Sequence, residues 1–269
     1  MDKTHRKFEK LKESIKSCGS LAVAFSGGVD STFLLYTAAS VPGGNVLAVT
    51  VSANTFPERE FSEAEEFCRE NNIRQTVVKA DVFSIEGFSE NPVNRCYICK
   101  KSIFGHIINA AAEAGISAVA EGSNMDDTGD YRPGMAAVKE MGILSPLKEA
   151  GLYKEEIRLL SKELGLPTWN KPSYACLASR FVYGETITAE KLLMVENAER
   201  FLLDRGLKQV RVRIHGDLAR IEVLPDDLSL FSDENTRNAV YGRLKELGFS
   251  YVSLDLRGYR TGSMNETIV

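Results

Sequence analysis

The chain has 269 residues, of which 43% are hydrophobic, enough for one large domain or two modest ones with a proper core. Its net charge of −4 argues against a nucleic-acid partner, and no apolar run approaches the ~18 residues of a membrane-spanning helix. A charged N-terminus unlike a signal peptide and an odd number of cysteines, five, predict a protein of the reduced cytoplasm.

Helical and strand patterns alternate from the start of the chain. Residues 3–17 carry apolar side chains on one stripe, which predicts a helix. Strands are predicted at residues 21–25, 45–51, 76–78 and 118–120, with helical patterns between them. Alternation at this spacing predicts a doubly wound parallel sheet, an α/β fold.

The stretch AFSGGVDST, residues 24–32, joins the first strand to a helix. Ser26, Gly27, Gly28 and Ser31 can aim backbone N–H groups and hydroxyls at an anion, and the helix dipole adds positive charge there. The two glycines permit a turn with positive φ and leave room for phosphate oxygens. Because the stretch contains neither GxxxxGK[ST] nor GxGxxG, it argues against a P-loop kinase or GTPase and against a dinucleotide fold.

SGGVDS resembles the pyrophosphate loop of the ATP pyrophosphatase (PP-loop) family, whose members split ATP into AMP and pyrophosphate. A plain glycine turn is the alternative. Since ligands of α/β sheets bind at the carboxyl ends of strands, Val51 and Ser52 should lie near the adenine or ribose. EGSNMDD, residues 121–127, resembles the second nucleotide motif of these enzymes. Gly122 would let backbone approach AMP, and Asp127 or the acid before it could help to hold Mg²⁺, although a polar loop with an N-cap explains the acids equally well.

Three cysteines stand in stretches that could carry chemistry. Cys96 and Cys99 would be i,i+3 neighbours on the first turn of a predicted helix, where nearby basic residues favour thiolates. A single CxxC fits half a zinc site, a redox pair or two inert thiols. Cys176 lies in a loop-like stretch after two prolines, and Arg180 supplies positive charge nearby; a buried core cysteine is the alternative.

Residues 185–269 are predicted to form a small α+β domain after a first domain of residues 1–184. Its predicted elements are a helix at 189–203, strands at 209–214 and 219–223, a helix at 235–247 and a strand at 251–256, an αββαβ order.

A two-residue turn at 216–217 can close the first two strands of this domain into a hairpin. The resulting register pairs Arg213 with Arg220. It also pairs Arg211 with Glu222. Arginines stacked on one face suggest an anion site, because a solvated sheet face would normally mix the signs of charge more evenly.

In combination, SGGVDS, EGSNMDD, GDYRPG, GLPTWNKPS and ACLASR resemble the LarE family over most of the chain. Members of that family are ATP-dependent sulfur transferases of nickel-pincer cofactor synthesis for lactate racemase, with an adenine nucleotide α-hydrolase-like fold. They adenylate a carboxylate of pyridinium-3,5-biscarboxylic acid mononucleotide and convert it to a thiocarboxylate. The resemblance implies ATP, Mg²⁺, a sulfide or other sulfur donor, other proteins of that pathway as partners, and a homo-oligomer, a hexamer.

The resemblance also implies roles for particular residues. Arg211 and Arg213 would bind the substrate phosphate, with Glu199 and Ser179 in the same site. The catalytic residues would be Asp30, Cys176 and Arg180.

Two branches of the family differ in their sulfur source. In one branch a single cysteine, matching Cys176, gives up its sulfur and becomes dehydroalanine. In the other, three cysteines that match Cys96, Cys99 and Cys176 bind a [4Fe–4S] cluster whose open iron can carry an extra sulfide. The three-cysteine pattern favours the cluster branch, while a sacrificial Cys176 with Cys96 and Cys99 as a reducing pair stays open.

Two rival functions remain. A tRNA thiolase uses the same type of loop and reactive cysteines on a nucleic-acid substrate. Such an enzyme should have a basic appended RNA-binding domain, whereas this chain is acidic. A non-catalytic nucleotide-binding or metal-scaffold protein would bind ATP without turnover, which the release of pyrophosphate would distinguish.

Overall fold

The computed structural model describes residues 2–128, 133–172 and 175–266, so most of the GDYRPG stretch lies outside the described residues. The chain forms two compact units, Met1–Ile85 with Cys96–Tyr174, and Glu86–Arg95 with Ala175–Val269. This division departs from the boundary expected after residue 184. Gly184 N–H donates to Asn91 O at 2.9 Å and Ile187 N–H donates to Ser89 O at 2.8 Å, and these hydrogen bonds tie residues 86–95 to the second unit.

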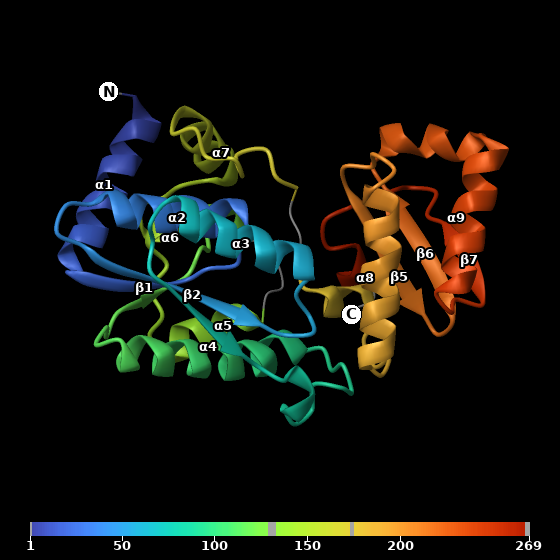
Figure 1. Ribbon diagram of the computed structural model, residues 1–269, viewed down its shortest axis with the longest axis horizontal. Helices are drawn as coiled ribbons and strands as arrows, with labels where there is room; N and C mark the ends of the chain where they lie inside the picture. Colours follow the sequence, from blue (N-terminus) through green and yellow to red (C-terminus); the bar gives the residue numbers. More distant parts are fainter. Residues whose placement is uncertain (1, 129–132, 173–174, 267–269) are drawn as a thin grey trace. The chain divides into compact units, whose positions relative to one another are not determined.

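A parallel four-stranded sheet with strand order β3-β2-β1-β4 forms the centre of the first unit, which confirms the predicted α/β fold (Figure 1). The strands are β1 (Ser20–Ala24), β2 (Asn45–Ser52), β3 (Gln75–Lys79) and β4 (Val119–Ala120). The α-helices are α1 (Lys3–Ser17), α2 (Val29–Ser40), α3 (Glu58–Glu70), α4 (Arg95–Glu113), α5 (Gly134–Glu140), α6 (Pro146–Glu149) and α7 (Lys154–Glu163). Two short 3-10 turns are η1 (Val82–Ser84) and η2 (Met125–Thr128).

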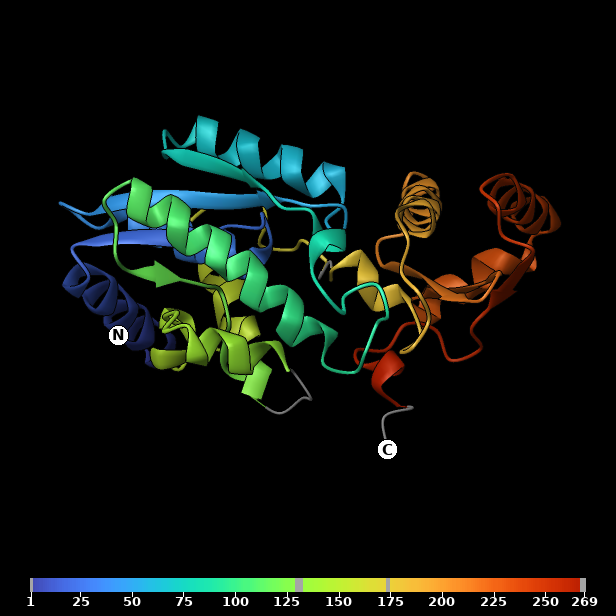
Figure 2. The same ribbon diagram turned by 90° about the horizontal axis from the view of Figure 1, so that it is seen from below.

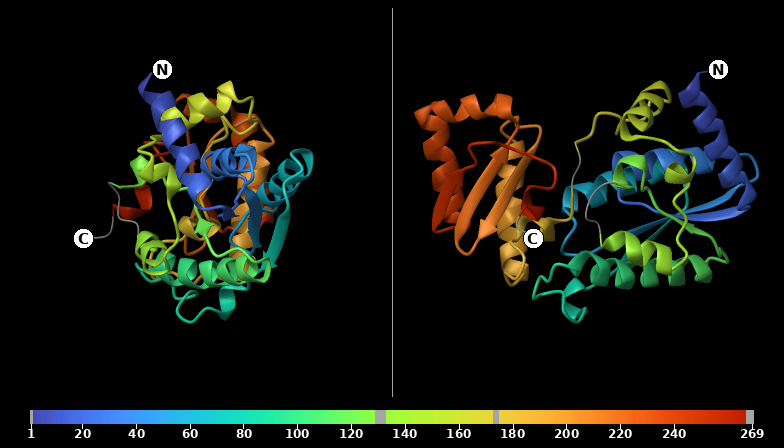
Figure 3. Two further views of the ribbon diagram at one scale, coloured as in Figure 1. Left: turned by 90° about the vertical axis from the view of Figure 1, so that its left-hand side faces the viewer. Right: turned by 180° about the vertical axis from the view of Figure 1, so that it is seen from behind.

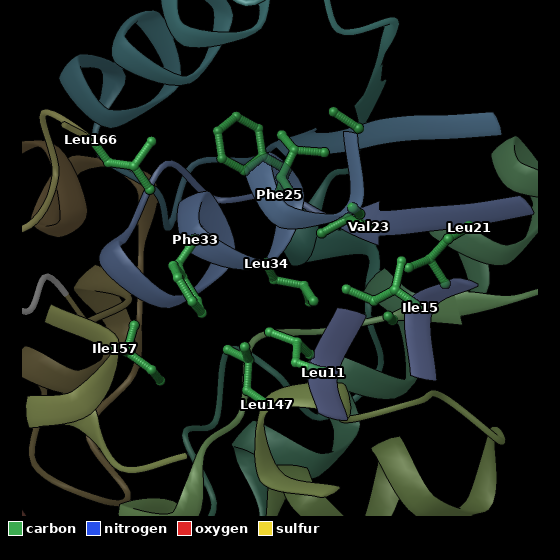
Figure 4. Close-up of a cluster of buried hydrophobic side chains, with 14 of the residues drawn as sticks. Leu11, Ile15, Leu21, Val23, Phe25, Phe33, Leu34, Leu147, Ile157 and Leu166 are labelled. Atoms are coloured by element: carbon green, nitrogen blue, oxygen red, sulfur yellow. The ribbon is translucent and has the colours of Figure 1, made fainter. Parts of the chain in front are cut away.

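Helices cover both faces of this sheet, with α1 and α2 on one face and α4 on the other (Figures 1 and 2). Side chains from α1, β1, α2, α3 and α7 contribute to one hydrophobic cluster, to which α3 adds Phe67. Figure 4 shows Leu11, Phe25, Phe33 and Ile157 of this cluster. The apolar stripe predicted for residues 3–17 therefore packs into this core. Within the described ranges, no helix combines the length and the apolar character needed to cross a membrane.

The carboxyl ends of the parallel strands share one edge of the sheet. At this edge β1 leads into the SGGVDS loop, β2 ends at Ser52 and β4 ends directly before EGSNMDD. Because ligands of α/β proteins bind at such edges, the topology brings the predicted nucleotide motifs to one place.

The second unit has a three-stranded sheet of order β5-β6-β7, whose strands are β5 (Val210–His215), β6 (Leu218–Val223) and β7 (Tyr251–Leu254). Its helices are α8 (Ala189–Leu203) and α9 (Glu234–Glu246), with 3-10 turns η3 (Leu177–Arg180), η4 (Pro225–Ser232) and η5 (Ser263–Asn265). Both helices lie on one face of the sheet and the C-terminal segment lies on the other (Figures 2 and 3). The predicted hairpin register is confirmed, because Arg213 pairs with Arg220 and Arg211 with Glu222.

Candidate functional site

The SGGVDS loop and the first turn of α2 form a cradle for an anion. Gly28 is the N-cap of α2, so the backbone N–H groups of the first turn are not used within the helix. Gly27 has φ of +72°, and a Cβ there would lie 3.2 Å from Ala64 Cβ on α3. Ser31 Oγ donates to Gly28 O at 3.2 Å and lies 3.1 Å from Ser26 Oγ, so both hydroxyls are fixed at the rim. The arrangement can accept phosphate oxygens.

The EGSNMDD segment packs directly on this cradle. A Cβ on Gly122 would lie 3.0 Å from Ser31 N and 3.2 Å from Asp30 Cβ, so glycine permits this close approach. Asn124 Nδ2 donates to Asp30 Oδ1 at 3.3 Å. Gly122 therefore shapes the cradle through backbone packing, and its contact with AMP stays a prediction.

Both aspartates of this segment accept hydrogen bonds from backbone. Asp127 Oδ2 accepts from Asn124 N–H at 2.8 Å, and Asp126 Oδ2 accepts from Lys154 N–H at 2.7 Å, at the first residue of α7. In the described ranges no group of three or more His, Cys, Asp and Glu side chains is arranged to hold a metal ion. A nucleotide-bound Mg²⁺ needs only one or two carboxylates besides phosphate, and Asp30 at the cradle rim fits that requirement.

Two lysines whose contacts were not predicted from the sequence also reach the loop. Lys154 Nζ donates to Asp30 Oδ2 at 2.5 Å. Lys171 Nζ donates to Gly27 O at 3.0 Å and to Glu63 Oε2 at 2.7 Å. Burial alone would raise the pKa of Glu63, but Lys171 and Arg59 hold that pKa below its usual value. These contacts join residues 124 and 144 positions apart, so no local pattern signals them.

Val51 and Ser52 are the last two residues of β2, at the edge where the loop lies. Both side chains are half-buried. Ser52 O accepts from Ala80 N–H at 3.0 Å, so this carbonyl is used in the backbone after β3. The position at the sheet edge is the one expected for residues near the adenine or ribose.

Cys96 and Cys99 lie on the first turn of α4, where the sequence predicted them. Cys96 is exposed and Cys99 is buried. A Cβ on Gly134, at the start of α5, would lie 3.4 Å from Cys96 O, so α5 begins beside this turn. Cys176, the third predicted ligand, belongs to the second unit.

Arg180 organises the backbone around Cys176, which is partly exposed at the start of η3. The buried Arg180 guanidinium donates to Ala175 O at 2.6 Å and to Cys176 O at 3.2 Å. It also donates to both carboxylate oxygens of Glu199, at 2.8 and 2.7 Å, and Glu199 Oε1 accepts from Val212 N–H at 2.9 Å. Burial would raise the pKa of Glu199, but the charge and hydrogen bonds of Arg180 hold it below its usual value.

Arg213 is almost completely buried, with 5% of its surface exposed. It donates to Glu222 Oε2 at 2.9 and 3.0 Å, to Ser179 O at 3.0 Å and to Ser263 Oγ at 3.2 Å. The arginine face of β5 is therefore not a solvated sheet face, because the C-terminal segment and η3 cover it.

Arg211 lies two positions before Arg213 on the same face of β5 and is 2% exposed. Its guanidinium donates to Val210 O at 2.8 Å and lies 5.3 Å from the centroid of the Tyr259 ring. Burial, together with the positive charge of Arg180, lowers the pKa of Arg211 to about 10. An added anion beside Arg211 would therefore stabilise its charged form.

Comparison with known proteins decides the family, although no protein-family model matches the chain. The chain is 39% identical over 263 residues to the pyridinium-3,5-bisthiocarboxylic acid mononucleotide synthase of Lactiplantibacillus plantarum, over 96% of this chain and 93% of that protein. The chain belongs to the LarE family of ATP-dependent sulfur transferases.

Two further relatives are similar to this LarE protein. An uncharacterized protein of Synechocystis is 40% identical over 263 residues, covering 97% of this chain and 98% of that protein. One component of the glutamine-hydrolyzing GMP synthase of Thermoplasma volcanium is 28% identical over 200 residues, covering 68% of this chain and 63% of that protein. The residues predicted to bind ATP belong to the first unit of this LarE protein, whereas Cys176 and the residues predicted to bind the substrate belong to the second.

Proposed function

We propose that this protein adenylates a carboxylate of pyridinium-3,5-biscarboxylic acid mononucleotide and converts it to a thiocarboxylate for the nickel-pincer cofactor of a lactate racemase. A carboxylate oxygen attacks the α-phosphorus of ATP, which gives an acyl adenylate and pyrophosphate. A sulfur nucleophile then forms the C–S bond and expels AMP. Adenylation is needed because a free carboxylate has no usable leaving group.

The cradle at the end of β1 is the observation that carries this proposal. Backbone N–H groups of the first turn of α2, with the Ser26 and Ser31 hydroxyls, would bind the pyrophosphate as it leaves. Asp30 would hold Mg²⁺, which would neutralise part of the phosphate charge. The carboxyl ends of β2 and β4 would take the nucleoside, with Val51, Ser52 and Gly122 contributing to that part of the site. Asp127 or Asp126 would help Asp30 to hold Mg²⁺.

The test of the ATP step is the release of AMP and pyrophosphate from the purified protein with ATP, Mg²⁺ and the substrate. Asp30→Ala and Ser31→Ala should abolish pyrophosphate formation and leave the circular dichroism spectrum unchanged. Ser40→Ala at the other end of α2, where Ser40 Oγ donates to Thr37 O, is the matched control and should release pyrophosphate normally. Normal release by both loop variants would overturn the assignment of the cradle.

We propose that the second unit binds the substrate, with Arg211 and Arg213 at its phosphate and Ser179 and Glu199 in the same site. The three guanidinium groups of Arg180, Arg211 and Arg213 outnumber the two carboxylates with which they interact, those of Glu199 and Glu222. This excess of positive charge supports a preference for an anion. Arg211→Ala and Arg213→Ala should weaken substrate binding at least tenfold, because charge-assisted hydrogen bonds are lost, and should spare ATP binding.

For the sulfur source, we propose that Cys96, Cys99 and Cys176 are the ligands of a [4Fe–4S] cluster. The CxxC pair on the first turn of α4 supports this, because two ligands are already held by one helix. When bound, such a cluster would supply an iron that carries the sulfide to be transferred. The alternative is direct transfer of the Cys176 sulfur, which would leave dehydroalanine, with Arg180 fixing the backbone at that cysteine.

Anaerobic reconstitution with iron and sulfide separates these two sulfur sources. Wild type should hold about four irons and form several thiolated products per chain. Single alanine variants of Cys96, Cys99 and Cys176 should lose both properties, whereas Cys18→Ala should keep them. If wild type stops after one sulfur and Cys176 loses the mass of H₂S, the sacrificial mechanism is correct instead.

The same proposal places the protein in the cytoplasm as a homo-oligomer, a hexamer by family resemblance, supplied with sulfide or another sulfur donor and working with other proteins of the pathway. A tRNA substrate is disfavoured by the net charge of −4. Pyrophosphate release that depends on the mononucleotide and not on tRNA would exclude the tRNA thiolase.

A further inference from the structure

An ion pair between Lys154 and Asp30 lies at the rim of the cradle. Lys154 Nζ and Asp30 Oδ2 are 2.5 Å apart, and 27% and 23% of the two side chains are exposed to solvent. Asp30 is the second residue of α2, so this carboxylate lies in the turn whose N–H groups form the cradle. Its other oxygen, Oδ1, accepts from Asn124 at 3.3 Å.

The backbone of Lys154 is held firmly at the start of α7. Its N–H donates to Asp126 Oδ2 at 2.7 Å. The preceding residue, Tyr153, donates its N–H to Glu156 Oε2 at 2.9 Å within a capping box. Because the helix start is fixed from both sides, the flexible side chain of Lys154 is the part that can move between partners.

The charges explain why a lysine stands here. An isolated carboxylate at the rim would repel the phosphates that the cradle is built to accept, whereas an aspartate paired with a lysine does not. Ion pairs that are partly exposed contribute little to stability, so this pair can be broken at small cost. A triphosphate offers Lys154 several anionic oxygens in place of one carboxylate.

We propose that Lys154 is an exchangeable counter-ion of the ATP site. In the free protein it neutralises Asp30, and in the ATP complex it binds the triphosphate and releases Asp30 for Mg²⁺. The inference rests on the proposed function and adds to it a residue from α7 that binds phosphate and controls when Asp30 becomes available.

Equilibrium binding in the presence of EDTA tests the phosphate contact without catalysis or metal. Lys154→Met should weaken the binding of ATP and of pyrophosphate at least tenfold, because it removes charge-assisted hydrogen bonds, and should change AMP binding much less. Lys162→Met removes the same charge from the exposed end of α7 and should leave all three affinities within twofold of wild type. Unchanged affinities for ATP and pyrophosphate in Lys154→Met would overturn the proposal.

A second pair of variants separates direct phosphate binding from simple neutralisation of Asp30. If Lys154 binds phosphate itself, Lys154→Met should still weaken ATP binding at least tenfold when it is made in an Asp30→Asn protein. If that loss vanishes in the Asp30→Asn background, Lys154 acts only on Asp30 and the proposal is wrong.

Failure of the proposed function gives a different result. If wild type binds neither ATP nor pyrophosphate, the proposed ATP site itself is wrong. If wild type binds both ligands, but no more tightly than Lys154→Met does, only the proposed role of Lys154 is wrong. A circular dichroism melt of each variant verifies that the folded protein is compared, and Lys154→Arg, which keeps the charge, should retain most of the ATP affinity.

Discussion

Gly122 is the residue whose missing side chain most directly shapes the site. The nearest atoms to a Cβ at this position would be the backbone nitrogen of Ser31 and atoms of Asp30, between 3.0 and 3.3 Å away. The backbone at the start of a helix cannot easily move away, so a side chain at residue 122 would overlap with the cradle.

Gly122→Ala should therefore displace the cradle. We expect a loss of about 1–3 kcal/mol in the free energy of unfolding, as is typical of overpacking, together with weaker ATP binding. Gly105→Ala is the matched control, because nothing lies within 4 Å of a Cβ there and α4 should gain about 0.5–1 kcal/mol. Urea unfolding and ATP titration of both variants check the expectation, which equal stability in the two would contradict.

Site residues could be predicted from the sequence where neighbouring residues carry the signal. SGGVDS was recognisable because a strand, two glycines and a helix N-terminus are contiguous. Lys154 and Lys171 were missed because they reach the loop from 124 and 144 positions away. Lys154 stands in no motif, and GLPTWNKPS, which contains Lys171, does not indicate which part of the chain this lysine contacts. The same limit applies to Arg180, whose carboxylate partner on α8 is not signalled by the sequence around it.

Periodicity and turn chemistry predicted most helices and strands, and the two-residue turn predicted the register of β5 and β6 correctly. The membership of residues 86–95 in the second unit was not predictable, since it depends on hydrogen bonds to a segment about 90 residues later. Helix α7 is another element whose role emerges only in three dimensions. Its Arg158 donates to Trp169 O at 2.7 Å and to Lys171 O at 2.8 Å, so α7 fixes the segment that carries Lys171.

Arg158→Met should release this segment. This variant loses hydrogen bonds from a charged donor, and at a partly exposed site their loss should lower the stability of the segment by about 1–2 kcal/mol. We expect faster hydrogen exchange at Lys171 N–H, which donates to Thr168 O at 2.9 Å. Arg69→Met breaks an exposed pair with Glu66 on α3 and should leave that exchange rate unchanged, which serves as the control. Equal rates at Lys171 in both variants would show that Arg158 does not hold the segment.

The two units differ in what their interiors contain. The first unit contains the hydrophobic cluster around α2. Among the described residues of this unit, Glu121 is the charged residue that is buried. The second unit buries a larger charged set, namely Arg95, Arg180, Glu199, Arg211, Arg213 and Glu222. Stability of the second unit must therefore depend more strongly on the ionisation of its carboxylates.

Acid should consequently unfold the second unit before the first. In the folded protein the pKa of Glu199 lies below its ordinary value of 4.5. The stability that the ionised Glu199 contributes is therefore fully present above pH 4.5, and it is lost as the pH falls through the lowered pKa of the folded state. Hydrogen exchange of β5 and β6 reports on the second unit, and fluorescence of the single tryptophan, Trp169, reports on the first. On lowering the pH from 6 to about 3, protection of β5 and β6 should disappear first.

Glu199→Gln isolates the carboxylate in this acid experiment. At neutral pH the variant should lose about 3–5 kcal/mol of stability in the second unit, because the buried Arg180 and Arg211 are left uncompensated. Its remaining stability should depend less on pH below 4.5 than that of wild type, since one titrating group with a lowered pKa is gone. Glu163→Gln, an exposed change at the end of α7, controls for the loss of a negative charge. If wild type and Glu199→Gln lose protection of β5 and β6 with the same pH dependence, the buried Arg180–Glu199 pair is not what makes the second unit sensitive to acid.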